Sequence, residues 1–169
     1  MAKGRNIVAS GDPKGVFRDV IISGTPKPGM IMEMTTSVEV QGKSTYQARS
    51  TTAGSKGAIA VLMPDELQGV IGVGASLGAN LGNDVGDAYV SGTIGRVYFP
   101  IAGEDLNLLV GSVAGTADDV AIGDLFGVNN DGKLKANSSY TSAPFQALEV
   151  ITDPTADYIA CFRYLGNNA

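Results

Sequence analysis

Glycine interrupts this chain from end to end, and this distribution restricts the fold more than any other feature. The 169 residues include 23 glycines, and strong helix-forming residues never run far between them. A glycine inside a helix costs about 1 kcal/mol relative to alanine, whereas turns accommodate it well. We therefore expect an all-β protein, a small β-barrel or β-sandwich with an extended N-terminal arm and little helix.

Short apolar runs separated by turn residues provide the candidate strands. The run 31–40 places Met32, Met34, Val38 and Val40 on one parity, which predicts a half-buried strand. Asn-Asp-Gly at 130–132 predicts a hairpin turn, because aspartate and glycine tolerate positive φ. Proline followed by acidic residues at 64–68 predicts one short helical turn. We expect strands at 16–24, 31–40, 58–63, 89–90, 94–101, 106–110, 145–151 and 157–165.

Parts of the chain differ in composition. Residues 1–15 are polar and lack periodicity, which predicts an extended arm. Residues 16–169 are expected to form a single β-rich domain. Within it, 41–57 is a long polar, basic loop without an acidic residue. Loops of this length are usually functional or mobile, so we expect this one to contact a partner.

Charge is also unevenly distributed. Residues 1–56 hold eight Lys and Arg against four Asp and Glu, whereas residues 57–169 hold four against thirteen. This asymmetry indicates a basic interaction segment attached to an acidic body, with chance variation between two solvated surfaces as the alternative. Because the whole chain carries a formal charge of −5 and has no recognition motif, we do not expect nucleic-acid binding.

The residue types that are missing exclude several chemistries. The chain has no histidine, which removes His-based acid–base catalysis and the commonest metal ligand. Its single cysteine, Cys161, lies in a strand-like run, where we expect a small buried side chain rather than a reactive thiol. No run has the character of a signal peptide or a transmembrane segment, so we expect synthesis in a cytoplasm and no membrane association. We also expect no cofactor.

Residues 74–78 read Gly-Ala-Ser-Leu-Gly, which matches the G-x-S-x-G pattern of a serine hydrolase. Ser76 would need a downstream histidine as its base, and the chain has none. The dinucleotide fingerprint fails as well, because Leu77 occupies the place of the third glycine. We interpret these glycines as turns or as close approaches between strands.

Acidic residues are the remaining candidates for an enzyme or a metal site. The pairs Glu104-Asp105 and Asp118-Asp119 lie at predicted turns, where solvated loop acids are the expected role. The segment 127–138 has a calcium-loop-like order around Asp131, but its first and twelfth positions lack carboxylates. We therefore expect neither an enzyme nor a bound metal.

Three segments of the second half occur in a characteristic order. They are RVYFPIAGEDLNLLV at 96–110, IGDLFGVNNDGKL at 122–134 and ALEVI at 147–151. In this order the region 85–165 resembles the capsid decoration proteins, or cement proteins, of tailed phages. The basic first half lies outside the resemblance.

The resemblance implies a structural virion protein, made in the host cytoplasm and bound to the outer capsid surface. It would form a homotrimer and stabilise the shell by bridging subunits of the major capsid protein, often through an extended N-terminal segment. The alternative is another virion component, or a receptor- or sugar-binding module such as a head-fibre or tail protein.

The basic residues of 1–15 and 41–57 are the candidate capsid contacts. We expect that removal of 1–15 abolishes capsid binding and leaves the β-rich domain folded. The candidate residues are Lys3, Arg5, Lys14, Lys43, Arg49 and Lys56.

Overall fold

The computed structural model describes residues 7–9, 13–35, 42–48, 58–64, 88–113, 116–117, 119–136, 144–152 and 157–166. These residues form strands and turns without a helix, so the all-β expectation is confirmed. The strands are β1 (Val16–Ser23), β2 (Ile31–Met34), β3 (Thr45–Ala48), β4 (Ala60–Leu62), β5 (Ile94–Phe99), β6 (Asp105–Val110), β7 (Ser112–Val113), β8 (Thr116–Ala117), β9 (Leu125–Val128), β10 (Leu134–Ala136), β11 (Phe145–Ala147) and β12 (Tyr158–Tyr164).

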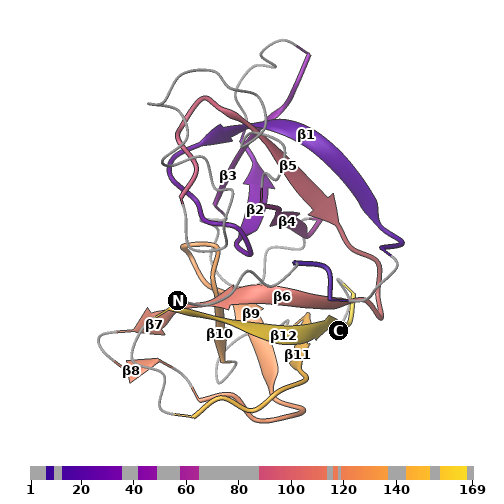
Figure 1. Cartoon of the computed structure of the whole chain (residues 1–169), viewed down its shortest axis with the longest axis vertical. Helices are drawn as coiled ribbons and strands as arrows, with labels where there is room; N and C mark the ends of the chain where they lie inside the picture. The colour runs from indigo at the N-terminus through magenta and orange to yellow at the C-terminus, as the bar shows by residue number, and fades with distance from the viewer. Residues whose placement is uncertain are drawn as a thin grey trace.

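The strands close into two barrels, which lie one above the other in Figure 1. The first barrel has the order β1-β3-β2-β4-β5, and the second has the order β10-β6-β12-β11-β9. Strands β7 and β8, which lie between β6 and β9 in the sequence, form a separate two-stranded sheet. The β-rich region therefore contains two small barrels where the sequence predicted one barrel or sandwich.

Both barrels have the same topology. In each, the first strand in sequence pairs in parallel with the third and antiparallel with the fifth. The second strand pairs with the third and the fourth, and the fourth pairs with the fifth. The chain therefore holds a structural repeat in which β1 of the first barrel corresponds to β6 of the second.

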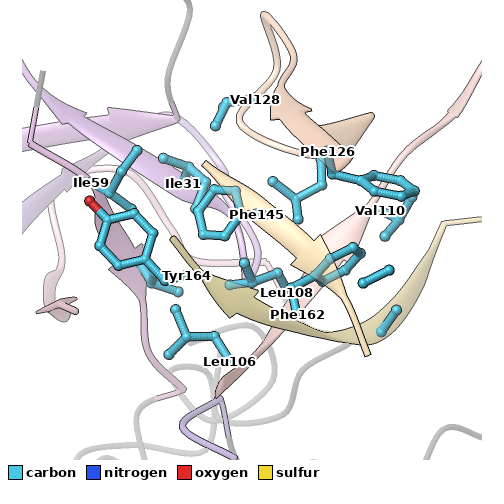
Figure 2. Close-up of a cluster of buried hydrophobic side chains, with 14 of the residues drawn as sticks. Ile31, Ile59, Leu106, Leu108, Val110, Phe126, Val128, Phe145, Phe162 and Tyr164 are labelled. Atoms are coloured by element: carbon cyan, nitrogen blue, oxygen red, sulfur yellow. The ribbon is translucent and has the colours of Figure 1, made fainter. Parts of the chain in front are cut away.

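The two barrels share a hydrophobic core. Ile31, Ile59 and Tyr98 belong to the first barrel but pack with side chains of the second, as Figure 2 shows for Ile31 beside Phe145 and for Ile59 beside Tyr164. A smaller cluster that includes Val20, Ile22 and Met32 fills the first barrel.

Backbone hydrogen bonds also join the barrels. The N–H of Leu109 donates to the carbonyl of Gly29 at 3.0 Å, and the N–H of Ile31 donates to the carbonyl of Gly132 at 2.7 Å. Gly29 has a φ of 86°, and a Cβ there would lie 3.2 Å from the backbone nitrogen of Leu109. Glycine at this position therefore allows the barrels to approach each other.

The expected hairpin at 130–132 is confirmed. It joins β9 and β10, with a hydrogen bond of 3.0 Å from the N–H of Gly132 to the carbonyl of Asn129 and a φ of 78° at Gly132. The expected strands at 16–24, 58–63, 94–101, 106–110, 145–151 and 157–165 all contain strands.

Some local predictions were wrong. Met34 was expected on the same buried face as Met32, but Met34 is exposed, whereas Met32 packs in the cluster that fills the first barrel. Tyr89 is buried beside the first barrel but does not form a strand. Residues 36–40 and 65–68, and with the latter the expected helical turn, lie outside the described residues.

Cys161 is only partly buried, in contrast to the expectation. Along β12 the core side chains are Ala160, Phe162 and Tyr164, so Cys161 has the opposite parity and points away from the barrel interior.

Candidate functional site

The first half of β1 lies at an open side of the first barrel. On one side β1 pairs with β5 from Val16 to Ile21, but on the other side its pairing with β3 begins only at Ile21. Among the described residues, no strand pairs with residues 16–20 on that second side. We call the backbone of 16–20 on this side the β1 edge.

The backbone groups that point out from the β1 edge follow from the pairing. The N–H of Ile22 donates to Thr93 on the β5 side, whereas the N–H of Ile21 donates to Ser44 on the β3 side. Because the direction alternates along a strand, Phe17 and Asp19 direct their N–H and C=O groups toward the open side. These groups can form hydrogen bonds with an added strand.

Apolar side chains are exposed at the β1 edge. Val16 is 62% exposed and Phe17 is 43% exposed. The Phe17 ring packs on the Tyr98 ring with a centroid separation of 4.7 Å. One side of the Phe17 ring therefore contacts Tyr98, and the remainder of the side chain is exposed to solvent. Arg18 places its guanidinium carbon 5.8 Å from the centre of the Phe99 ring.

The same surface is basic. Lys14 and Arg18 are exposed at the edge, while Asp19, the acidic residue among them, pairs with Arg96 of the neighbouring β5 at 3.0 Å. Lys43 is half-buried. It lies two residues before Thr45, the first residue of β3 that pairs with β1. The structure therefore places two of the predicted contact residues, Lys14 and Lys43, at the two ends of the opening.

The other four predicted contact residues, Lys3, Arg5, Arg49 and Lys56, lie outside the described residues, as do Ser76 and Asp118.

A second exposed surface lies on the second barrel. Ile122, Leu125 and Val150 are 69%, 45% and 59% exposed. Pairing of Val120 with Ile151, and a hydrogen bond of 2.9 Å from Gly123 to Ala147, hold the two segments that carry these side chains alongside each other. Asp119 and Asp124 are exposed nearby. We call Ile122, Leu125 and Val150 the distal patch, and sequence analysis missed it because its residues belong to different segments.

Residues 7–9 of the arm lie on the second barrel. Val8 bridges to Leu106 of β6 in antiparallel fashion, with Asn107 donating to Ile7 at 2.7 Å and Ala9 donating to Asp105 at 2.9 Å. Ile7 is fully buried in the shared core. Residues 7–9 of the predicted capsid-binding arm are therefore used within the molecule.

Glu104 anchors the base of the arm. It is only 4% exposed, so the prediction of a solvated turn acid was wrong for this residue. One carboxylate oxygen accepts from the Tyr98 hydroxyl at 2.5 Å and from the Lys14 N–H at 2.6 Å, and the other accepts from the Ile101 N–H at 2.8 Å. The Gly15 N–H donates to the Tyr98 oxygen at 2.7 Å.

These contacts move two pKa values in opposite directions. Burial by itself would raise the pKa of Glu104, but the hydrogen bonds from Tyr98, Lys14 and Ile101 outweigh it and lower that pKa below its ordinary value. Burial, together with the hydrogen bond to the Glu104 carboxylate, raises the pKa of Tyr98 to about 12. The arrangement is that of a structural hydrogen-bond network, with Glu104 charged and Tyr98 neutral at pH 7.

The neighbouring acids have different surroundings. Asp105 accepts two hydrogen bonds from Arg163, at 2.8 and 3.1 Å, and Asp119 is exposed. In the parts of the chain that the structure describes, no three acidic or cysteine side chains gather into a possible metal site. No helix within those parts is long and apolar enough to cross a membrane.

Comparison with known families and with curated proteins finds no match to this chain.

Proposed function

We propose that this chain is a capsid decoration protein that binds the outer surface of a phage shell and bridges subunits of its major capsid protein. The observation that carries the proposal is the pair of dissimilar exposed surfaces on one molecule, the basic β1 edge and the acid-flanked distal patch. The resemblance of residues 85–165 to cement proteins supplies the class of partner.

Bridging requires a body that transmits force between its contacts. The shared core and the backbone hydrogen bonds between the barrels make the molecule such a body. The two barrels cannot separate from each other without exposing buried residues such as Ile31 and Leu106. The β1 edge belongs to the upper barrel in Figure 1 and the distal patch to the lower one, so each can face a different shell subunit.

A protein that contacts two subunits at once gains affinity through linkage, since the second contact forms at a high effective concentration. A homotrimer multiplies this gain. Two modest surfaces are then sufficient, without a deep pocket on either partner. We further propose the homotrimer on the strength of the resemblance.

The test is co-sedimentation of the purified protein with empty shells of the tailed phage that encodes it. We expect saturable binding at a fixed ratio to the shell subunit. Binding should weaken as salt rises, because the Debye length falls from about 10 Å at 0.1 M to about 3 Å at 1 M. A chain that stays in the supernatant at every ratio would contradict the proposal and favour a receptor- or sugar-binding module.

A further inference from the structure

The internal repeat shows how a strand can cover the first strand of a barrel. Val20 and Ile22 of β1 face the core of the first barrel, as Leu108 and Val110 of β6 face that of the second. Both strands join their parallel partner at the end of this run, Ile22 with Tyr46 and Val110 with Leu134. By this register Arg18 corresponds to Leu106, and Phe17 and Asp19 correspond to Asp105 and Asn107.

On β6 this position holds a short antiparallel segment that forms an isolated β-bridge. The segment Ile7–Ala9 bridges Leu106, accepts from the N–H of Asn107 and donates to the carbonyl of Asp105. The corresponding groups of β1 are the N–H of Asp19 and the carbonyl of Phe17, which point to the open side. Burial differs accordingly, since Leu106 is fully buried whereas residues 16–19 are exposed.

We propose that the β1 edge receives an extended strand of the major capsid protein, antiparallel to β1 and centred on Arg18. This inference rests on the proposed function. The incoming strand accepts from the N–H of Asp19 and donates to the carbonyl of Phe17, as Ile7–Ala9 does on β6. Strand addition of this kind draws affinity from main-chain hydrogen bonds and selectivity from alternate side chains.

The surroundings of the edge define the sequence of that strand. Exposed Lys14 and Arg18 require acidic side chains opposite them, and exposed Val16 and Phe17 require apolar ones. The expected partner is therefore a short segment with two adjacent apolar residues opposite Val16 and Phe17 and with acidic residues opposite Lys14 and Arg18. The basic edge also disfavours pairing with a second β1 edge, because Arg18 would then approach the neighbour's cations.

A proline substitution tests the edge directly. Asp19→Pro removes an N–H that faces the open side, and the bonds between β1 and β5 remain because residues 18, 20 and 22 make them. Co-sedimentation with empty shells should show binding about tenfold or more weaker than that of the wild type, the loss expected for one main-chain hydrogen bond. Asp19→Asn loses the ion pair with Arg96 but keeps the N–H, so it should bind more tightly than Asp19→Pro.

The matched control is Asn130→Pro, which introduces proline at the second residue of the β9–β10 turn, where proline is favoured. It should bind as the wild type does. If Asp19→Pro binds as tightly as the wild type, the strand-addition inference is wrong and the decoration role stands. If the wild type itself does not bind shells, the proposed function fails and the inference fails with it.

Hydrogen exchange of the wild-type protein keeps the test decisive if Asp19→Pro does not fold. The amides of Phe17 and Asp19 should exchange at least about tenfold more slowly in the shell-bound protein than in the free protein. Unchanged exchange at saturating shell would overturn the inference.

Discussion

Glu104 connects residues that are distant in sequence through one carboxylate. Its partners come from the base of the arm, from β5 and from the β5–β6 turn. A buried network of this kind stabilises the fold only while every donor keeps its acceptor. The free-energy cost of leaving one buried polar group unsatisfied is larger than the net stabilisation that one hydrogen bond provides.

Glu104→Gln should therefore lower the free energy of unfolding by about 1–3 kcal/mol at pH 7. The amide replaces one acceptor oxygen by a donor that faces other donors. Urea unfolding followed by circular dichroism measures the change. Asp119→Asn is the control, because Asp119 is exposed and should change stability by less than about 0.5 kcal/mol. Equal effects of the two substitutions would contradict the assigned role of Glu104.

Stability should also depend on pH through this network. The pKa of Glu104 is lowered in the folded protein, so its contribution is present above the unfolded pKa of about 4.3 and is lost as pH falls through the folded value. The pKa of Tyr98 is raised to about 12, so its contribution is present below about pH 10 and is lost toward pH 12. The stability difference between wild type and Glu104→Gln should shrink in acid, and a difference that stayed constant down to pH 2 would refute the linkage.

At the scale of elements, the arm segment 7–9 behaves as an added strand of the second barrel. Removal of all of 1–15 would take Ile7 out of the shared core and remove two donors, Lys14 and Gly15, from the Glu104–Tyr98 network. Loss of capsid binding after that truncation would therefore combine a lost contact with a damaged fold. Truncation of 1–6 separates the two effects.

Ile7→Ala should cost about 2–5 kcal/mol of stability, since it removes a fully buried branched side chain between the barrels. Thermal or urea unfolding measures it, with Ala9→Ser as the control because Ala9 is exposed. A cost for Ile7→Ala below about 0.5 kcal/mol would mean that the arm segment leaves β6 in solution.

At the scale of the whole molecule, the two barrels should unfold together. Their largest cluster contains Ile31 and Tyr98 from one barrel and Leu106, Phe126 and Phe162 from the other. Hydrogen exchange should give the same opening free energy for the core amides Leu62 and Phe162, and Ile31→Ala should lower both by a similar amount. Different values, with only that of Leu62 lowered by Ile31→Ala, would show that the barrels are independent units.

Much of the local structure could be predicted from the sequence. Alternation, glycine and the Asn-Asp-Gly turn placed β1, β5, β6, β12 and the β9–β10 hairpin, because these depend on residues close together in the chain. The errors at Met34, Cys161 and Glu104 have a common cause. Each depends on what packs against the residue from a distant segment, and a short stretch of sequence does not contain that information.

The sequence by itself determined that the chain is all-β, rich in turns, without histidine and basic at its beginning. Only the tertiary structure decided that the strands form two barrels of one topology, because the repeat lies in the order of hydrogen-bonded pairs rather than in similar residues. The tertiary structure also decided where the basic side chains lie on the surface. Lys14 and Arg18 lie at an open strand edge, and Arg96 lies beside Asp19 because β1 and β5, more than seventy residues apart in sequence, pair along their length.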